Sequence, residues 1–423
     1  EVNLHFLAAD IAEVGGQAQL DLLWMATSDD DCTMVGTNFH HPGDAYYSFA
    51  HTLPASHLVH WVCKVWIPGT AEAKAEAVAR SAATVSFSGF LSVTTCQLPH
   101  AVADLLLKNT SLEEAPPMLG FSLQSPLADG WNAEPMQLCA APRPRRRRFL
   151  SACTATLHSA AYIHKLLPHA VEDWINYHLL IGVEHFTLFD TDGSYEAYVQ
   201  DFVDRGIVTY HGRFPSRVSS KLGLLASGLR SQAEQRAMLL EPHALDVCVW
   251  ENRQVSDWVV VVHSFEEYLH SPSMVDSVGS FPLAGAVRLW AREAPGVSVF
   301  ELFQEPMGGP RAPNARSLLS MWTRKRGLDI ENLKYRDKLE ASQVHFQPFS
   351  WILDPLNTLQ TAVHFAQARA DGQKVVALPI DTVRMNHYVD LGSNSSRCLR
   401  QLGGCEYPDD SITWAEDLLV QMR

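Results

Sequence analysis

The feature that most constrains the fold is a run of apolar residues that passes directly into polar ones. It begins at Trp258, continues through four valines and is followed by His263-Ser-Phe-Glu-Glu267. Unbroken runs of β-branched residues are typical of strands buried on both faces of a parallel sheet. Open α/β sheets bind ligands where such strands end. We therefore expect Ser264, Glu266 and Glu267 to line a crevice. A core strand followed by an exposed acidic turn is the alternative.

The residues around this run alternate between strand and helix patterns. Strand patterns fall at 149–157, 183–189 and 207–210, and helical periodicity falls at 169–181, 195–203 and 220–240. This β-α order predicts a mostly parallel, doubly wound sheet. Asp190 ends one of the strands. It should therefore share a sheet edge with Ser264 and Glu266.

The first third of the chain has a different pattern. Short apolar alternations at 57–67 and 84–94 are separated by Pro and Gly and predict a small, sandwich-like β domain. The alanine-rich segment 71–83 predicts a short helix within it. Residues 140–148 are dense in Pro and Arg, which is typical of an exposed linker. We therefore expect a β-rich domain at 1–139, a linker at 140–148 and an α/β domain at 149–423.

Length and charge narrow the class of protein. A chain of 423 residues is long enough for two domains. Its composition, 47% hydrophobic and 19% charged, is that of a globular protein. A net charge of -14 argues against a nucleic-acid or anionic-membrane binder, because both need a positive field. The printed chain contains no signal peptide and no apolar run near the roughly 18 residues that a membrane span needs.

Cysteines and glycosylation acceptors indicate the compartment. The chain has eight cysteines, none in a zinc-binding spacing, at positions 32, 63, 96, 139, 153, 248, 398 and 405. Asn109 and Asn394 each begin an Asn-x-Ser/Thr acceptor triplet. Together these features favour a disulfide-bonded glycoprotein of the secretory pathway, in the Golgi lumen or outside the cell. A reduced cytosolic protein is the alternative.

Several common enzyme signatures are missing from the sequence. No Gly-x-Gly-x-x-Gly or Gly-x-x-x-x-Gly-Lys-Ser/Thr loop follows a strand, which disfavours a dinucleotide oxidoreductase and a P-loop enzyme. No Gly-x-Ser-x-Gly elbow is present, which disfavours a serine hydrolase.

The block from Asp173 to Asp190 carries a resemblance to a known family. It reads Asp-Trp-Ile-Asn-Tyr-His and continues through Gly-Val-Glu-His-Phe to Leu-Phe-Asp. The family signature has Glu-Trp, then Tyr-His, then Gly-Val-x-His-Phe before a Tyr-Asp-Asn strand end. Further matches follow in the family's order at Gln235, Cys248, Trp258, Glu266-Glu-Tyr-Leu269, Asn386-His-Tyr388 and Cys405–Ile412. Residues 149–423 thus resemble glycosyltransferase family 92.

The resemblance implies a GT-A fold that moves a sugar, often galactose, from a UDP-sugar to a glycan or glycoprotein, usually with Mn²⁺ and with inversion. The family binds metal and diphosphate through an Asp-x-Asp, where this chain has Ser264-Phe-Glu266. A serine hydroxyl is neutral and a weak ligand, so one negative charge and one strong oxygen donor are lost. His387 matches a family histidine and is a third candidate ligand, because imidazole suits manganese. The family's Lys-Asn-Glu is also replaced, by residues of 158–162.

Roles for other residues follow from the resemblance and from chemistry. Candidates for nucleotide-sugar binding are Asp190, Asp192, Lys334 and Arg336. An inverting transferase also needs a general base near the acceptor hydroxyl. The candidates for this base are Glu301, Glu305 and Asp354, although Asp354 precedes a proline and is also suited to cap a helix.

Three functions are compatible with these residues. The chain is an active manganese-dependent transferase with a variant metal site, or it keeps the fold as a glycan-binding or structural protein without donor binding. In the third possible function, the chain transfers sugar without metal and holds the diphosphate with Arg or Lys. The sequence leaves the donor sugar, the acceptor, the general base and the oligomeric state open.

Overall fold

The structure is a computed structural model. It describes residues 2–14, 17–28, 62–66, 75–80, 91–100, 102–103, 118–124, 136–139, 147–166, 168–214, 233–271, 282–307, 323–324, 350–362, 365–368, 374–379, 382–388, 407–408, 419 and 421–422. The chain divides into two compact units. One contains residues 1–147 with 218–225 and 253–255, and the other contains 148–217, 226–252 and 256–423.

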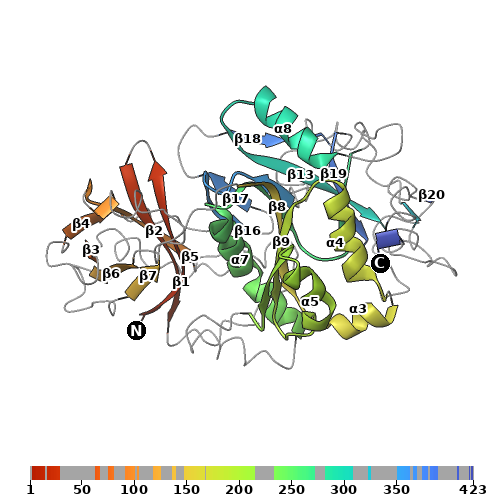
Figure 1. Ribbon diagram of the computed structural model, residues 1–423, viewed down its shortest axis with the longest axis horizontal. Helices are drawn as coiled ribbons and strands as arrows, with labels where there is room; N and C mark the ends of the chain where they lie inside the picture. The colour runs from red at the N-terminus through yellow and green to blue at the C-terminus, as the bar shows by residue number, and fades with distance from the viewer. Residues whose placement is uncertain are drawn as a thin grey trace. The chain divides into compact units, whose positions relative to one another are not determined.

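The first unit is an antiparallel sheet (Figure 1). Its strands are β1 (Val2–Val14), β2 (Gln17–Ser28), β3 (Val62–Trp66), β4 (Ala75–Arg80), β5 (Leu91–Gln97), β6 (Met118–Gln124) and β7 (Met136–Cys139). They are bonded in the order β1-β2-β5-β4-β3-β6-β7. A disulfide between Cys63 and Cys96 links β3 to β5 across β4. The β-rich expectation is met, but the described strands form one bonded sheet.

The helix expected at 71–83 is wrong, because residues 75–80 form strand β4. Alanine favours helices, and the spacing of four between Glu76 and Arg80 is also helical, so the local sequence does not indicate a strand. β4 pairs with β3 on one side and β5 on the other. Pairing on both edges therefore overrides the weaker local preference.

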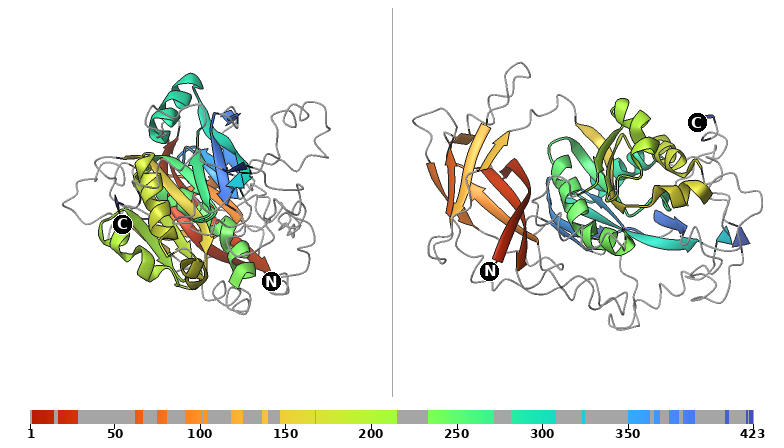
Figure 2. Two further views of the ribbon diagram at one scale, coloured as in Figure 1. Left: turned by 90° about the vertical axis from the view of Figure 1, so that its right-hand side faces the viewer. Right: turned by 90° about the horizontal axis from the view of Figure 1, so that it is seen from below.

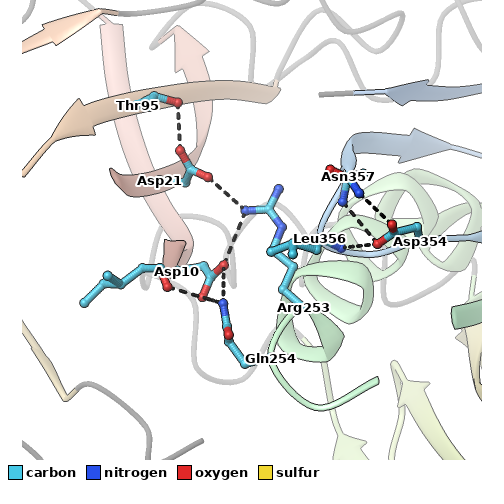
Figure 3. A network of polar contacts seen from close by, with 9 residues as sticks. Asp10, Asp21, Thr95, Arg253, Gln254, Asp354, Leu356 and Asn357 are labelled. Carbon is cyan, nitrogen blue, oxygen red and sulfur yellow. Dashed lines mark hydrogen bonds and ion pairs between the residues drawn. The ribbon is translucent and has the colours of Figure 1, made fainter. Parts of the chain in front are cut away.

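A buried charge network lies within the first unit (Figure 3). The guanidinium of Arg253 is fully buried and lies 3.3 Å from the equally buried carboxylate of Asp21 and 4.0 Å from Asp10. Thr95 donates a 2.8 Å hydrogen bond to Asp21, and Gln254 donates one of 3.2 Å to Asp10. Buried charges are stable only when paired in this way.

The second unit is built on a mixed sheet flanked by helices (Figures 1 and 2). Its strands are β8 (Arg148–Leu157), β9 (His185–Asp190), β10 (Val208–Gly212), β11 (Ser256–Val262), β12 (Glu267–His270), β13 (Val297–Met307), β14 (Thr323–Arg324), β15 (Ser350–Leu353), β18 (Lys374–Ala377), β19 (Arg384–Tyr388) and β20 (Tyr407–Pro408). The main path is β10-β9-β8-β11-β15-β13-β14-β20. β16 (Thr358–Ala362) and β17 (Phe365–Ala368) form a separate hairpin.

Helices cover both faces of this sheet. The described helices are α3 (Ala160–Leu166), α4 (Ala170–Leu180), α5 (Glu196–Asp204), α7 (Ala233–Asn252) and α8 (Leu283–Glu293). Trp258, Val260 and Val262 pack into one core with α4, α5 and α8, whereas Val261 faces a second core with α7. The four valines are therefore apolar because both faces of β11 are buried.

Two expectations for this unit need correction. The sheet is mixed. β10, β9, β8 and β11 are parallel, and β13 is parallel to β18 and β19, but β15 pairs antiparallel with both β11 and β13. The last helix expected before β11 does not end at 240 but continues to Asn252. A disulfide between Cys153 and Cys248 ties this added part of α7 to β8. Its apolar residues pack under the sheet, so burial extends the helix beyond the segment with visible periodicity.

Disulfides in both units fit an oxidising compartment, secreted or lumenal. Among the helices of the described ranges, none is both long and apolar enough to cross a bilayer.

We predict that Arg253→Ala lowers the free energy of unfolding by about 3–5 kcal/mol, because Asp21 loses its buried counter-charge. Arg205→Ala is the matched control, since Arg205 forms an exposed ion pair with Asp201, and it should cost less than about 1 kcal/mol. Urea denaturation followed by circular dichroism measures both. Similar losses in the two variants would contradict the importance of the buried network.

Candidate functional site

The candidate site lies at the carboxyl ends of the parallel strands. β8 is first in the chain and pairs with β9 on one side and with β11 on the other. The order β10-β9-β8-β11 therefore reverses between β8 and β11, which is where open α/β sheets bind ligands. The loops that leave β8, β9 and β11 supply the residues of this edge.

Asp190 holds the loop that follows β9. Its side chain is fully buried. Oδ1 accepts the backbone N–H of Asp192 and Gly193, both at 3.1 Å. Oδ2 accepts the N–H of Tyr195 at 2.8 Å and the hydroxyl of Tyr210 at 2.6 Å. Burial raises the pKa of Asp190 to about 6, although the hydrogen bonds from Tyr210 and Tyr195 oppose this shift. Both oxygens are thus used to shape the loop.

Asp192 is the carboxylate of this loop that solvent reaches. It accepts the backbone N–H of Ser159 at 2.9 Å and that of Ser194 at 3.1 Å. Partial burial alone would raise the pKa of Asp192, but these hydrogen bonds and others around it hold the pKa below its usual range. The hydroxyl of Ser194 also accepts the N–H of Ala160 at 2.9 Å. The loops after β8 and β9 are therefore joined at the edge.

The corner between β11 and β12 alternates between half-exposed and buried side chains. Ser264 and Glu266 are half-exposed, as expected for a crevice, and the hydroxyl of Ser264 accepts the N–H of Glu266 at 3.2 Å. Phe265 is buried, with its ring centroid 5.1 Å from that of Trp174 and 5.3 Å from that of Tyr195. This wedge fixes which side chains of the corner point outward.

Glu267 is fully buried, so its expected place in the crevice is wrong. Its Oε2 accepts the backbone N–H of His263 at 2.8 Å, and its Oε1 lies 3.1 Å from Nδ1 of the same residue. Nε2 of His263 lies 4.0 Å from Oε1 of Glu241 on α7. A buried carboxylate needs such a partner, and the imidazole next to it supplies one.

The charges in this cluster depend on one another. Burial alone would lower the pKa of His263, but the negative charges of Glu267 and Glu241 outweigh it and raise the pKa to about 9. Burial raises the pKa of Glu241 to about 7, against the attraction of His263. At neutral pH a charged imidazole, between the carboxylate of Glu267 and a partly protonated Glu241, therefore closes the end of β11.

Side chains of helix α4 donate hydrogen bonds to the backbone of β12. Trp174 donates from Nε1 to the carbonyl of Glu267 at 2.7 Å, and Tyr177 donates its hydroxyl to the carbonyl of Leu269 at 2.6 Å. Gly182, at φ 101°, turns the chain after α4, and a Cβ there would lie 2.8 Å from Cβ of Ala284. Trp174 and Tyr177, two residues of the sequence block that resembles the family signature, thus have a structural role.

His178 is a fully buried core residue of α4. Its Nδ1 bonds to the carbonyl of Trp174 at 2.8 Å, and its ring lies 5.8 Å from that of Tyr268. Nε2 has no hydrogen-bond partner among the described residues. Burial lowers the pKa of His178 to about 4, so the ring is neutral at physiological pH.

Strand register brings two further candidates to this edge. β12 pairs with β19 so that Glu267 lies opposite His387, and β19 pairs with β13 so that Asn386 lies opposite Glu305. Because β13 runs parallel to β11 and continues past its end, the backbones of Glu305 and His387 lie beside the β11–β12 corner. The structure describes their backbones only.

Of the other two general-base candidates, Glu301 lies nearer this edge than Asp354. Glu301 pairs with Trp351, which also pairs with Val261, so Glu301 is level with the residue before the carboxyl end of β11, and β15 separates the two strands. Leu353 pairs with Val259, so Asp354 follows towards the opposite end of the sheet. There Asp354 accepts the N–H of Leu356 and bonds to Asn357 (Figure 3). Asp354 therefore caps a turn that leads into β16, and not a helix as the sequence suggested.

Some sequence candidates fall outside the described residues. These are Lys334, Arg336 and both glycosylation acceptors, Asn109 and Asn394. In the part of the chain that is described, no three His, Cys, Asp or Glu side chains are arranged to hold a metal ion. The manganese site stays a prediction.

Sequence reasoning missed several residues of this edge. His263 ends the valine run, and its spacing of four from Glu267 was a usable signal. Glu241 was passed over because the helix was expected to end one residue earlier. Ser159 and Arg213 both have positive φ, 58° and 56°, which no local pattern revealed.

No protein-family model matches the chain, and a search of curated proteins finds no significant match. The resemblance to glycosyltransferase family 92 therefore rests on the residues quoted above.

We predict that His178→Phe makes the protein less sensitive to acid. The pKa of His178 is about 4 in the folded protein and about 6.5 when unfolded. The unfolded state therefore binds more protons between these pH values, and stability falls as pH falls through this window. The variant should lose less stability than the wild type between pH 6.5 and 4, by up to about 3 kcal/mol. Urea denaturation at stepped pH measures the slope.

His100→Phe, at an exposed histidine of the first unit, is the control and should keep the wild-type slope. An unchanged slope in His178→Phe would show that this buried ring does not set the acid response.

Proposed function

We propose that the chain is a glycosyltransferase similar to family 92, which transfers a hexose such as galactose from a UDP-sugar to a glycan or glycoprotein with inversion. One observation carries the proposal. The strand order β10-β9-β8-β11 corresponds to the first four strands of the doubly wound nucleotide-binding order, and Asp192, Ser264 and Glu266 are solvent-accessible at the carboxyl edge of these strands. A GT-A arrangement of this unit is compatible with that order, including the antiparallel strands that follow.

The residues at the edge have distinct proposed roles. Asp192 accepts hydrogen bonds from the ribose hydroxyls, whereas Asp190 keeps the loop in place from below. Glu266 and His387 would hold Mn²⁺, with Ser264 as a weak third ligand. When bound, the metal neutralises charge on the diphosphate. Glu266 offers a half-exposed carboxylate for this, which is the oxygen ligand that such ions prefer.

The reaction itself needs a base on the acceptor side. Of the three candidates, Glu305 is the one whose backbone lies beside the β11–β12 corner. In the proposed step, Glu305 takes the proton of the acceptor hydroxyl, whose oxygen attacks the anomeric carbon. The bond from that carbon to the diphosphate breaks, and UDP leaves with the electron pair. Inversion follows from attack opposite the leaving group.

One observation favours a second candidate function, a glycan-binding or structural protein that has lost donor binding. The Ser264 hydroxyl is occupied by the N–H of Glu266, and Glu267 is committed to His263. Within 263–267 a single carboxylate therefore stays half-exposed, fewer than an Asp-x-Asp provides. In either case, we propose a secretory-pathway location, the Golgi lumen included.

Calorimetric titration with UDP and UDP-galactose, with and without Mn²⁺, tests the proposal. We expect micromolar binding that needs the metal, and a loss of at least about tenfold in Glu266→Ala, because a charge-assisted contact of more than about 1.4 kcal/mol is removed. Glu293→Ala is the matched control. It removes an exposed glutamate at the end of α8, which leads to the amino end of β13.

Metal-dependent binding that is equal in Glu266→Ala would place the metal elsewhere. Metal-independent binding would favour the third function, in which a cationic side chain holds the diphosphate. Binding to no UDP compound, together with binding to glycans, would reject the transferase and favour the glycan-binding protein.

A further inference from the structure

Among the described residues other than glycine, two have a positive φ, and both lie next to the β9 loop. Ser159, at φ 58°, donates its N–H to Asp192. Arg213, at φ 56°, precedes Phe214, which donates its N–H to the carbonyl of Asp190 at 2.7 Å. Residues other than glycine are strained in this conformation. Strain of this kind concentrates at binding sites, where the surrounding structure enforces it.

The turn at Arg213 buries its neighbour and exposes the arginine. Gly212 is in register with Asp190, and Phe214 packs edge-on against Phe189 with ring centroids 5.0 Å apart. Arg213 lies between them and is exposed. Glycine would make the same turn without strain. The turn itself does not require an arginine, so we attribute the presence of Arg213 to a role of its side chain.

The absence of a side chain at Gly193 leaves room for the side chain of Arg213. A Cβ at Gly193 would lie 3.1 Å from Cγ and 3.2 Å from Nε of Arg213. The arm of the arginine therefore lies directly against the β9 loop. That loop is rigid, because the buried carboxylate of Asp190 accepts four hydrogen bonds beneath it. An arm that rests on a fixed loop has fewer conformations to lose when a ligand binds.

The charge of Arg213 is not neutralised within the described part of the chain. None of the described carboxylates forms an ion pair with it. Asp190 is occupied by its own donors, and Asp192 accepts the N–H of Ser159 and Ser194. An exposed guanidinium without a carboxylate partner is suited to a phosphate group, which it binds through two parallel hydrogen bonds.

We propose that Arg213 is the anchor of a phosphate-binding subsite at the carboxyl end of β10, supported by Gly193, for a phosphorylated small molecule. β10 and β11 are separated by β9 and β8, so three strand spacings of about 4.8 Å place the two strand ends roughly 14 Å apart. The subsite is therefore distinct from Ser264 and Glu266. It does not require that the chain is a transferase.

Titration of the full chain with inorganic pyrophosphate, in the absence of Mn²⁺, tests the subsite. We expect Arg213→Gln to weaken binding by about tenfold or more, because a charge-assisted contact is lost. Arg213→Lys keeps the positive charge but loses the paired N–H donors of the guanidinium. Its affinity for pyrophosphate should therefore lie between those of the wild type and Arg213→Gln. Arg213→Gly removes the side chain and also the strain, so it should fold at least as stably as the wild type and still lose binding.

Two glycine variants displace the arginine without removing it. Gly193→Ala pushes the arm of Arg213 away and should weaken pyrophosphate binding. Gly206→Ala is the control: Gly206 has a similar φ of 70° against 76° at Gly193, but nothing lies within 4 Å of a Cβ placed there. Both variants carry the same kind of backbone strain. A loss confined to Gly193→Ala therefore reports the position of Arg213.

The outcomes separate this subsite from the transferase. No pyrophosphate binding by the wild type, equal binding in Arg213→Gln, or equal losses in the two glycine variants would each overturn the subsite. UDP-galactose binding that depends on Glu266 would stand in all three cases. Pyrophosphate binding that depends on Arg213, in a chain that binds no UDP compound, would support the subsite and reject the transferase.

Discussion

The candidate site depends on the hydrogen bonds from α4 to the backbone of β12. The indole N–H of Trp174 and the hydroxyl of Tyr177 are buried and each needs an acceptor, and the carbonyls of Glu267 and Leu269 provide them. These bonds fix where the chain turns after β11. Phe265 is held as a wedge against Trp174, and as a result Ser264 and Glu266 face solvent.

The same turn contains a buried charge cluster whose members are needed together. Glu267 is tolerated in the core because His263 bonds to it through both backbone and ring, while Glu241 approaches the ring from α7. Removing one member would leave a buried charge without a partner, which costs far more than an exposed pair contributes. The cluster closes the end of the valine strand and leaves Glu266 as the accessible carboxylate of the corner. The corner therefore exposes fewer carboxylates than an Asp-x-Asp site would.

The second constraint on the edge is the loop after β9. Four donors converge on the buried carboxylate of Asp190, and the loop then joins β8 through Asp192 and β10 through Arg213. Asp190, which was expected to contact a ligand, thus supports the loop instead. Rigid loops of this kind are suited to binding because little order has to be gained when a ligand arrives. The transferase and the phosphate subsite are separate proposals that share the β9 loop, through Asp192 in the first and through Gly193 in the second.

The sequence by itself determined the elements with strong periodicity and the class of fold. The valine run predicted β11, and Ser264 and Glu266 were correctly expected to be accessible. The strands and helices expected between 149 and 210 were placed to within a few residues, although helix α3 was not expected. Only the tertiary structure decided that Ala75–Arg80 is a strand, that Asp190 and Glu267 turn inward, and that Asp354 lies at the far end of the sheet. It also brought Glu241, Arg213 and His387 to the edge. The physical reason is that periodicity reports burial along one element. Residues distant in the chain decide which strands pair, in which direction they run, and which residue neutralises each buried charge.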